Sequence, residues 1–105
     1  MSELVPRSQA AFAQARALMP GGVNSPARAC GSVGADPIFI KSAQGAWVTD
    51  IDGNRYRDFV GAFGPMILGH GHPRVREAVR AQIDLGFSFC TPTEGESDLA
   101  RRITE

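Results

Sequence analysis

One short stretch carries the residue types best suited to bind an anion: GGVNSPAR, from Gly21 to Arg28. Its two glycines give the backbone freedom to turn, Pro26 stiffens that turn, and Ser25 offers a hydroxyl. Arg28 adds a planar set of N–H donors that matches a carboxylate or a phosphate. Two interpretations are open, an anion-binding loop or a plain turn with a solvated arginine, and the residues alone favour the plain turn because glycine-rich turns are common. The stretch is not a Walker phosphate-binding loop, since it lacks GKS or GKT.

Any chemistry that needs a lysine amine depends on one residue, because Lys41 is the only lysine among eleven basic residues. Lys41 directly follows the apolar run Ile38–Ile40 of a predicted strand. A Schiff-base lysine needs a desolvating pocket, and nothing in the neighbouring sequence indicates one. We therefore expect Lys41 to be a solvated lysine at the edge of a strand.

Three carboxylates, Asp50, Asp52 and Asp58, lie close together in the sequence. Such a cluster could serve acid–base or metal chemistry. However, Asp52 has the position of a turn residue, and Arg55 and Arg57 are near enough to pair with the other two across strands. An EF-hand is excluded because no glutamate closes the loop. We expect all three carboxylates to be structural.

Two histidines, His70 and His72, are separated by one residue and could ligate a metal ion. A metal site needs at least a third ligand, and Cys30 and Cys90 are not at zinc-finger spacing. We therefore expect packed or capping histidines before a helix, and no metal site. The two cysteines are expected to be free thiols rather than a disulfide, as is usual in the cytoplasm.

The composition indicates one small globular domain of 105 residues, with 43% apolar and 21% charged residues. Basic and acidic residues both number eleven, so the net charge is zero, which argues against nucleic-acid or polybasic membrane partners. No apolar run is long enough for a membrane span, and residues 1–7 lack the apolar core of a signal peptide. We expect a cytoplasmic protein.

Periodicity and turn signals place the elements that would position these residues. A helix is predicted from Ser8, as its N-cap, to Met19, and Pro20 with two glycines ends it. Its apolar face comprises Phe12, Ala15, Leu18 and Met19. A strand over Pro37–Ala43 and a hairpin of Ala46–Ile51 with Arg55–Val60, turning at Asp52-Gly53, predict a three-stranded antiparallel sheet.

The remainder of the chain alternates glycine-rich loop and helix. The stretch Gly61–His72 combines four glycines with apolar residues, which predicts buried backbone in close approach to another segment. A helix begins at Pro73, carries the stripe Val75, Val79 and Ile83, and stops before Gly86. A capping box from Thr93 to Glu96 begins a last helix. Because the chain ends within this helical pattern, we expect it to be a truncated sequence.

The predicted fold class is α+β. Residues 1–20 form an N-terminal arm and helix, residues 21–72 form the glycine loop and the antiparallel β segment, and residues 73–105 form a helical segment. That segment is expected to lead into a larger domain that this chain does not contain.

Four stretches resemble the glutamate-1-semialdehyde 2,1-aminomutase family of class-III aminotransferases, which have the fold-type-I architecture. They are MPGGVNSPARA (Met19–Ala29), AWVTDIDGNRYRDFVG (Ala46–Gly61), GPMILGHGHP (Gly64–Pro73) and SFCTPTEGE (Ser88–Glu96). The hairpin and the GHGHP loop are shared with class-III aminotransferases in general, whereas PGGVNSPAR is the more specific motif and points to the aminomutases. The resemblance covers nearly the whole chain from Ser8 onward and implies its N-terminal part.

The resemblance implies an activity and a cofactor for the whole enzyme. Members of this family use pyridoxal 5'-phosphate (PLP), act as homodimers and convert glutamate-1-semialdehyde to 5-aminolevulinate, the precursor of tetrapyrroles. It further implies that Ser25 and Arg28 bind the substrate carboxylate, which reverses the plain-turn interpretation. Phe63 matches a position beside the substrate where the family usually has tryptophan, so an aromatic wall remains without the indole N–H. Cys90 stands where many members have glycine.

The same resemblance implies that residues 1–105 contain no catalytic residue and do not hold the cofactor. The family's cofactor lysine, its pyridine-binding aspartate and its phosphate-binding turn would all lie beyond Glu105, and Lys41 is not at the lysine position. The chain alone is therefore expected to be inactive. Two alternatives remain open: a class-III aminotransferase with a different amino donor, and a small binding module without catalysis.

Overall fold

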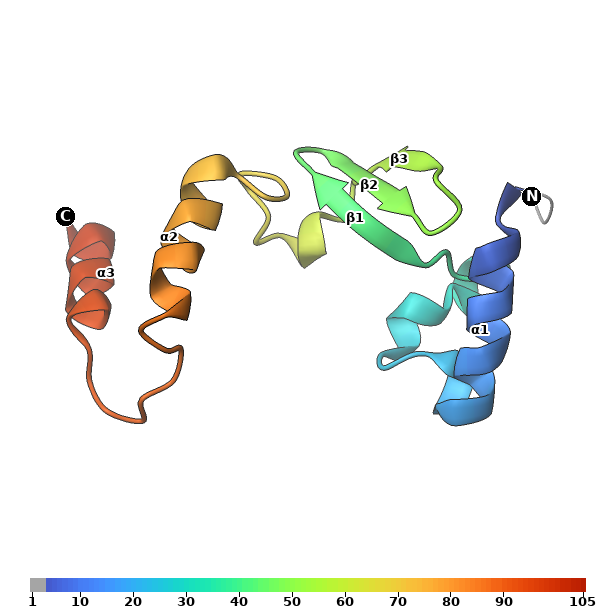
Figure 1. Cartoon of the computed structure of the whole chain (residues 1–105), viewed down its shortest axis with the longest axis horizontal. Coiled ribbons are helices and arrows are strands. Elements are labelled where there is room, and N and C mark those ends of the chain that lie inside the picture. Colours follow the sequence, from blue (N-terminus) through green and yellow to red (C-terminus); the bar gives the residue numbers. More distant parts are fainter. Residues whose placement is uncertain (1–3) are drawn as a thin grey trace. The chain divides into compact units, whose positions relative to one another are not determined.

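The computed structural model describes residues 4–105, and its elements fall into two compact units (Figure 1). The first unit ends at His72 and contains helix α1 (Pro6–Leu18) and strands β1 (Ile40–Gln44), β2 (Trp47–Asp50) and β3 (Arg55–Arg57). It also contains 3-10 turns at Pro20–Gly22, Pro26–Ala29, Gly31–Val33 and Gly61–Phe63. The second unit, Pro73–Glu105, contains helices α2 (Pro73–Ile83) and α3 (Glu94–Thr104). The predicted α+β class, with one helix before a three-stranded antiparallel sheet and helices after it, is confirmed.

Helix α1 begins earlier than predicted, at Pro6, so the assignment of Ser8 as its N-cap is wrong. Proline suits the first helical position because its missing N–H would have no partner there. The helix start is capped from outside: the Asp52 carboxylate accepts the backbone N–H groups of Arg7 at 2.8 Å and Ser8 at 3.0 Å. Ser8 is 1% exposed, and its Oγ accepts the N–H of Phe39 at 3.1 Å. These contacts connect the start of α1 to the hairpin loop, through Asp52, and to the residue just before strand β1, through Phe39.

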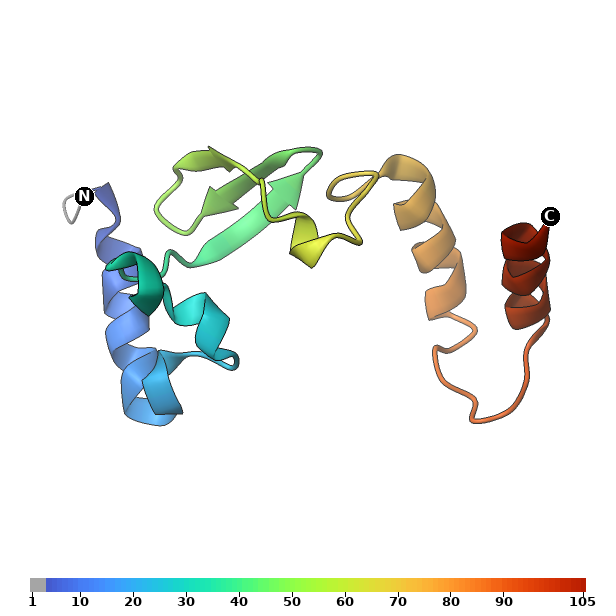
Figure 2. The ribbon, with the colours of Figure 1, turned by 180° about the vertical axis from the view of Figure 1, so that it is seen from behind.

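The end of α1 follows the prediction. The helix stops at Leu18, and the turn Pro20–Gly22 lies against it, as both views show (Figures 1 and 2). Gly22 has φ +72°, and a Cβ at this position would lie 2.7 Å from the Phe12 ring, so only glycine fits. Of the predicted apolar face, Ala15 is buried, whereas Leu18 is 84% exposed.

The sheet has the order β1-β2-β3, and both pairs are antiparallel. Strand β1 begins at Ile40 and β3 ends at Arg57, so both are shorter than predicted. The hairpin turns through Gly53, which has φ +97°, and the Asp50 N–H bonds the Asn54 carbonyl at 3.0 Å across the loop. The predicted Asp-Gly turn is therefore present within a loop of residues 51–54.

Arg55 and Arg57 do not pair with aspartates, contrary to prediction. Their guanidinium carbons lie 4.9 and 5.1 Å from the centre of the Trp47 ring. Arg57 is directly opposite Trp47, and Arg55, two residues away on the same strand, faces the same side of the sheet. Cation–π stacking on the indole is thus the contact available to both arginines. Asp50 lies on the other face and is fully buried.

In the second unit, α2 begins at Pro73 and α3 follows Thr93, as predicted. Gly86, with φ +98°, follows α2 and donates its N–H to the Gln82 carbonyl at 3.1 Å. The predicted capping box has a different form, because the Thr93 hydroxyl donates to the Glu96 carboxylate at 3.3 Å and caps no backbone N–H. The apolar residues of both helices are exposed within this unit: Val75, Val79, Ile83, Leu99 and Ile103. Among residues 4–105, no helix combines the length and the apolar character needed to cross a membrane.

Candidate functional site

Ser25 and Arg28 share one rigid turn. Ser25 is extended, Pro26 starts a 3-10 turn at Pro26–Ala29, and the Arg28 N–H bonds the Ser25 carbonyl at 2.9 Å. This hydrogen bond and the proline ring fix the backbone between the two side chains. Local structure alone therefore places on one turn the two residues that the resemblance implies for carboxylate binding.

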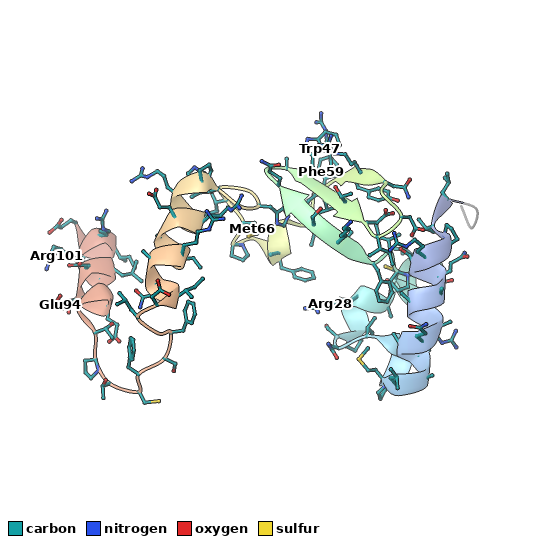
Figure 3. All side chains as sticks on the ribbon, in the orientation of Figure 1. Arg28, Trp47, Phe59, Met66, Glu94 and Arg101 are labelled. Atoms are coloured by element: carbon teal, nitrogen blue, oxygen red, sulfur yellow. The ribbon has the colours of Figure 1, made fainter. Side chains whose placement is uncertain are left out.

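Both side chains of this turn are free to bind a ligand. Within residues 4–105, Arg28 makes no ion pair and the Ser25 hydroxyl makes no hydrogen bond. Arg28 is exposed and projects from its turn, away from α1 (Figure 3). A hollow of about 390 Å³, lined by residues of the same loop from Pro20 to Ala29, adjoins the turn. A guanidinium and a hydroxyl held this way suit an acidic small molecule.

Phe63 lies on a different turn, Gly61–Phe63, and its side chain is 79% exposed. Its backbone is unusual because φ is positive at four successive residues: Gly61 (+53°), Ala62 (+54°), Phe63 (+64°) and Gly64 (+121°). Left-handed backbone costs about 1–2 kcal/mol for each residue with a Cβ, so Ala62 and Phe63 are strained. No hydrogen bond in the described part links this turn to Ser25 or Arg28. The predicted buried backbone is seen only farther along, at Gly69, where a Cβ would lie 2.8 Å from the Gly45 carbonyl oxygen.

Asp58 and His70 hold the two ends of the loop that carries Phe63. Asp58 Oδ1 accepts the N–H groups of Val60 at 2.8 Å and Gly61 at 3.0 Å. Asp58 Oδ2 and His70 Nε2 are 2.6 Å apart. The hydrogen bond from His70, followed by those from the Gly61 and Val60 amides, holds the pKa of Asp58 below its usual value.

Sequence reasoning missed this pair. An aspartate two residues before Val60 is typical of a turn in which the side chain bonds the following amides. That signal could have found the bonds to Val60 and Gly61, whereas the bond to His70, twelve residues away, has no sequence signature. A hollow of about 310 Å³ lies beside the pair and is lined by Gly45, Gly61 and the segment Met66–His70 among others.

Asp50 is structural, as predicted, although its partners differ from those predicted. Its carboxylate accepts the Asn54 N–H at 2.7 Å, the Asn54 side-chain amide at 2.9 Å and the Tyr56 hydroxyl at 2.9 Å. Burial acts to raise the pKa of Asp50, but the hydrogen bonds from Asn54 and Tyr56 outweigh it, so the pKa is lowered overall. Burial, and next the Asp50 carboxylate, raise the pKa of the Tyr56 hydroxyl. The cluster fixes the hairpin loop.

The described residues do not fit PLP. Lys41 lies on strand β1, as predicted, and is exposed, so its amine has no desolvating pocket that would favour a Schiff base. In residues 4–105, no group of three or more His, Cys, Asp or Glu side chains is placed to hold a metal ion. Cys30 and Cys90 are free thiols, and His72 Nδ1 is buried with no hydrogen-bond partner in the described part. No reaction step can be derived through the cofactor on these residues.

Comparison with known proteins places this geometry in a family. Residues 30–104 match the family described as aminotransferase class-III. The chain is 56% identical over 105 residues to a glutamate-1-semialdehyde 2,1-aminomutase of Heliobacterium modesticaldum. It is 58% identical over 100 residues to the enzyme of that name from Rhodopirellula baltica, and 59% identical over 99 residues to that from Deinococcus radiodurans. These alignments take in 100%, 95% and 94% of the chain but 24%, 23% and 22% of the relatives, so the chain spans about a quarter of their length.

Solved structures agree with the sequence match. A glutamate-1-semialdehyde aminomutase from Pseudomonas aeruginosa superposes with a TM-score of 0.81 at 36% identity, over 96% of this chain and 23% of that one. A β-phenylalanine aminotransferase from Variovorax paradoxus superposes with a TM-score of 0.84 at 30% identity, over 97% of this chain and 23% of that one. The family match over residues 30–104 includes the strained loop of Phe63 and the helical unit up to Thr104. The chain belongs to the class-III aminotransferase family.

Proposed function

We propose that this chain is the N-terminal, substrate-binding part of a PLP-dependent aminomutase that converts glutamate-1-semialdehyde to 5-aminolevulinate. In this proposal Ser25 and Arg28 bind the substrate carboxylate, and Phe63 forms an aromatic wall beside the substrate. The activity belongs to the full-length enzyme, and residues 1–105 contribute binding residues but no catalytic residue.

The observation that carries the proposal is the turn with Ser25 and Arg28. Its guanidinium is exposed and unpaired within residues 4–105, and the backbone that presents it is fixed by Pro26 and by the 2.9 Å bond from Arg28 to Ser25. Because the backbone of the turn is already fixed, binding a carboxylate would order only the side chain of Arg28, whose planar guanidinium is pre-organised for two parallel hydrogen bonds. The curated relatives at 56–59% identity carry the aminomutase name, which supports an acidic substrate for this turn.

The chemistry at the amino group is supplied by PLP, which carries the group and stabilises the carbanion formed beside it. The lysine that holds PLP is proposed to lie in the rest of the full-length enzyme, because Lys41 does not fit that role. What this chain contributes is orientation. Ser25 and Arg28 hold the single carboxylate of the substrate, so the amino and aldehyde end of the substrate is presented to the cofactor.

The test uses the full-length enzyme and glutamate-1-semialdehyde, with no second amino donor. Wild type is expected to form 5-aminolevulinate. Arg28→Ala is expected to raise KM by about tenfold to a hundredfold, since a hydrogen bond to a charged group is worth about 1.5–3 kcal/mol. Arg102→Ala, at an exposed arginine of α3, is the matched control and should keep the wild-type KM. An unchanged KM in Arg28→Ala would remove the role of Arg28, and absence of 5-aminolevulinate in wild type would overturn the proposed reaction.

A second candidate is a class-III aminotransferase that uses another amino donor. Phe63 in place of the tryptophan that the resemblance implies leaves room for it, and a β-phenylalanine aminotransferase shares the fold of this chain. An aminotransferase needs an external acceptor, whereas an aminomutase transfers the amino group within one substrate. Product formed only when a 2-oxo acid is added would therefore select this candidate.

The full-length enzyme is further proposed to be a cytoplasmic homodimer that acts in tetrapyrrole biosynthesis. The resemblance to the aminomutases supports this, and the exposed apolar residues of α2 and α3 are compatible with burial in a larger assembly. Light scattering on the purified full-length enzyme should give twice the mass of one chain. A strict monomer with full activity would remove the dimer from the proposal.

A further inference from the structure

We propose that Asp58 and His70 are positioning residues: together they clamp the loop of residues 58–70 and so hold Phe63 at the substrate site. This inference rests on the proposed function, in which Phe63 is a wall of that site. In the proposed function neither Asp58 nor His70 contacts the substrate. Both affect the reaction only by fixing the backbone of residues 58–70, which carries Phe63.

The first end of the loop is fixed by one carboxylate oxygen. Asp58 Oδ1 accepts two successive backbone N–H groups, from Val60 at 2.8 Å and from Gly61 at 3.0 Å. Val60 directly precedes the left-handed segment that contains Phe63, and Gly61 is its first residue. The Phe63 N–H donates to the Val60 carbonyl at 2.9 Å, so contacts that fix Val60 also restrain the backbone of Phe63.

The second end of the loop is fixed by the other oxygen. Asp58 Oδ2 meets His70 Nε2 at 2.6 Å. The backbone of His70 is itself anchored, since its N–H and its carbonyl each form a 2.8 Å hydrogen bond with Gly45, which follows strand β1. The Asp58 carboxylate therefore bonds to both ends of the loop, and the hydrogen bonds between His70 and Gly45 connect the second end to the residue that follows strand β1.

The conformation of Phe63 explains why a clamp is needed. Ala62 and Phe63 have positive φ although both carry a Cβ, and such backbone persists only when surrounding contacts impose it. Packing does not impose it here, because the Phe63 side chain is 79% exposed. Among residues 4–105, the loop's own backbone bonds are all local and tie the turn to no other element: Phe63 to Val60 at 2.9 Å, Gly64 to Gly61 at 3.0 Å, Met66 to Gly61 at 3.2 Å and Gly69 to Met66 at 2.9 Å. The bonds of Asp58 are therefore the contacts that hold the strained turn in place.

The first arm of the test measures the loop itself, in the full-length enzyme, by hydrogen exchange and mass spectrometry. Asp58→Ala and His70→Ala should speed the exchange of the amides of residues 60–64 by about tenfold or more. His70→Gln should restore part of the protection, since its amide can donate to Asp58. If Asp58→Ala fails to fold, His70→Ala alone decides the test, because it leaves the bonds from the Val60 and Gly61 amides to Asp58 in place and removes only the bond to the second end of the loop. Asp36→Asn, at an exposed aspartate, is the matched control. Unchanged exchange in the Asp58 and His70 variants overturns the clamp.

The second arm tests whether the clamp acts through Phe63. Asp58→Ala should lower kcat/KM for glutamate-1-semialdehyde by about tenfold to a hundredfold, mostly through KM, as expected for a displaced substrate-positioning group. In a Phe63→Ala background the same Asp58→Ala change should have little further effect, because the residue that the clamp positions is already gone. An equal loss in both backgrounds overturns the positioning role and leaves a purely structural one.

The two arms separate this inference from the proposed function. If wild type does not convert glutamate-1-semialdehyde, the proposed reaction fails and the substrate role of Phe63 fails with it. The exchange arm then still decides whether Asp58 and His70 clamp the loop. If wild type is active and the double-variant cycle shows no coupling, the proposed function stands and the positioning role is overturned.

Discussion

The Phe39 N–H donates to the Ser8 Oγ at 3.1 Å, and this bond joins helix α1 to the segment that leads into strand β1. Ser8 is 1% exposed, so its hydroxyl is shielded from water and is available to the amide. The serine is within the helix rather than at its cap, and its hydroxyl serves the neighbouring segment. Much of what holds the first unit together is of this kind: a polar side chain of one element that satisfies the backbone of another.

Ser8→Ala tests the first of these contacts. The substitution suits a helix but leaves the part-buried Phe39 N–H without its acceptor, so the free energy of unfolding should fall by about 1–3 kcal/mol. Urea unfolding of the full-length enzyme, followed by a probe in the first unit, measures the change. Ser32→Ala, at an exposed serine, should leave the midpoint unchanged. Equal midpoints for the Ser8 and Ser32 variants would show that the bond to Phe39 does not contribute.

The cap that Asp52 provides to α1 gives a second prediction. Asp52→Ala removes the acceptor of the Arg7 and Ser8 amides and should destabilise the helix start by about 1 kcal/mol, as loss of an N-cap does. Asp52→Asn retains one acceptor oxygen and should have an intermediate effect. Amide exchange in the first turn of α1 is the readout, with Asp36→Ala as the exposed control. If exchange in that turn is the same in all variants, the carboxylate is not the cap.

Cys90 gives a prediction of the opposite sign. It has φ +53°, a conformation that favours glycine, and glycine is the residue that the resemblance places there. Cys90→Gly should relieve about 1–2 kcal/mol of backbone strain, of which about 0.5–1 kcal/mol is offset by the greater freedom of glycine in the unfolded chain. A small rise in Tm is expected. Cys90→Ala is the matched control: it keeps the Cβ and should give no gain. A gain in Cys90→Ala equal to that in Cys90→Gly would assign the effect to the thiol and not to the backbone.

Local patterns predicted the elements of this chain well. Alternation around Asp52-Gly53 indicated the hairpin, and the structure has it with Gly53 at positive φ. Pro73 indicated the start of α2, and Pro20 with its glycines ended α1. The turn that carries Ser25 and Arg28 could also be predicted, because its geometry depends only on neighbouring residues and on Pro26.

What the sequence did not reveal are contacts between residues far apart in the chain. The sequence predicts a turn at Asp52, but its role as the cap of α1 depends on a residue 45 positions away. The sequence predicts an arginine partner for Asp58, whereas the structure shows a bond to His70. Neither partnership has a period or a motif, because both arise only when the sheet brings separate segments together. The strain at Phe63 was also missed, since φ at a residue other than glycine is set by such contacts.

The lowered pKa of the buried Asp50 carboxylate leads to a prediction about how low pH reduces the stability of the hairpin. Its pKa in the folded chain lies below the ordinary 3.8, because the hydrogen bonds from Asn54 and Tyr56 outweigh burial. A group whose folded pKa is depressed stabilises the fold above its unfolded pKa, and this contribution is lost as the pH falls through the folded pKa. Tyr56→Phe removes the 2.9 Å bond to Asp50 Oδ2, so the folded pKa should rise and the stabilising contribution should shrink. Titration of the Asp50 carboxyl carbon by NMR measures this pKa in wild type and variant, with Asp36 in the same spectra as the exposed reference. An Asp50 pKa that stays the same in Tyr56→Phe would mean that the backbone and side chain of Asn54, with the Gly53 amide, hold the carboxylate ionised without Tyr56.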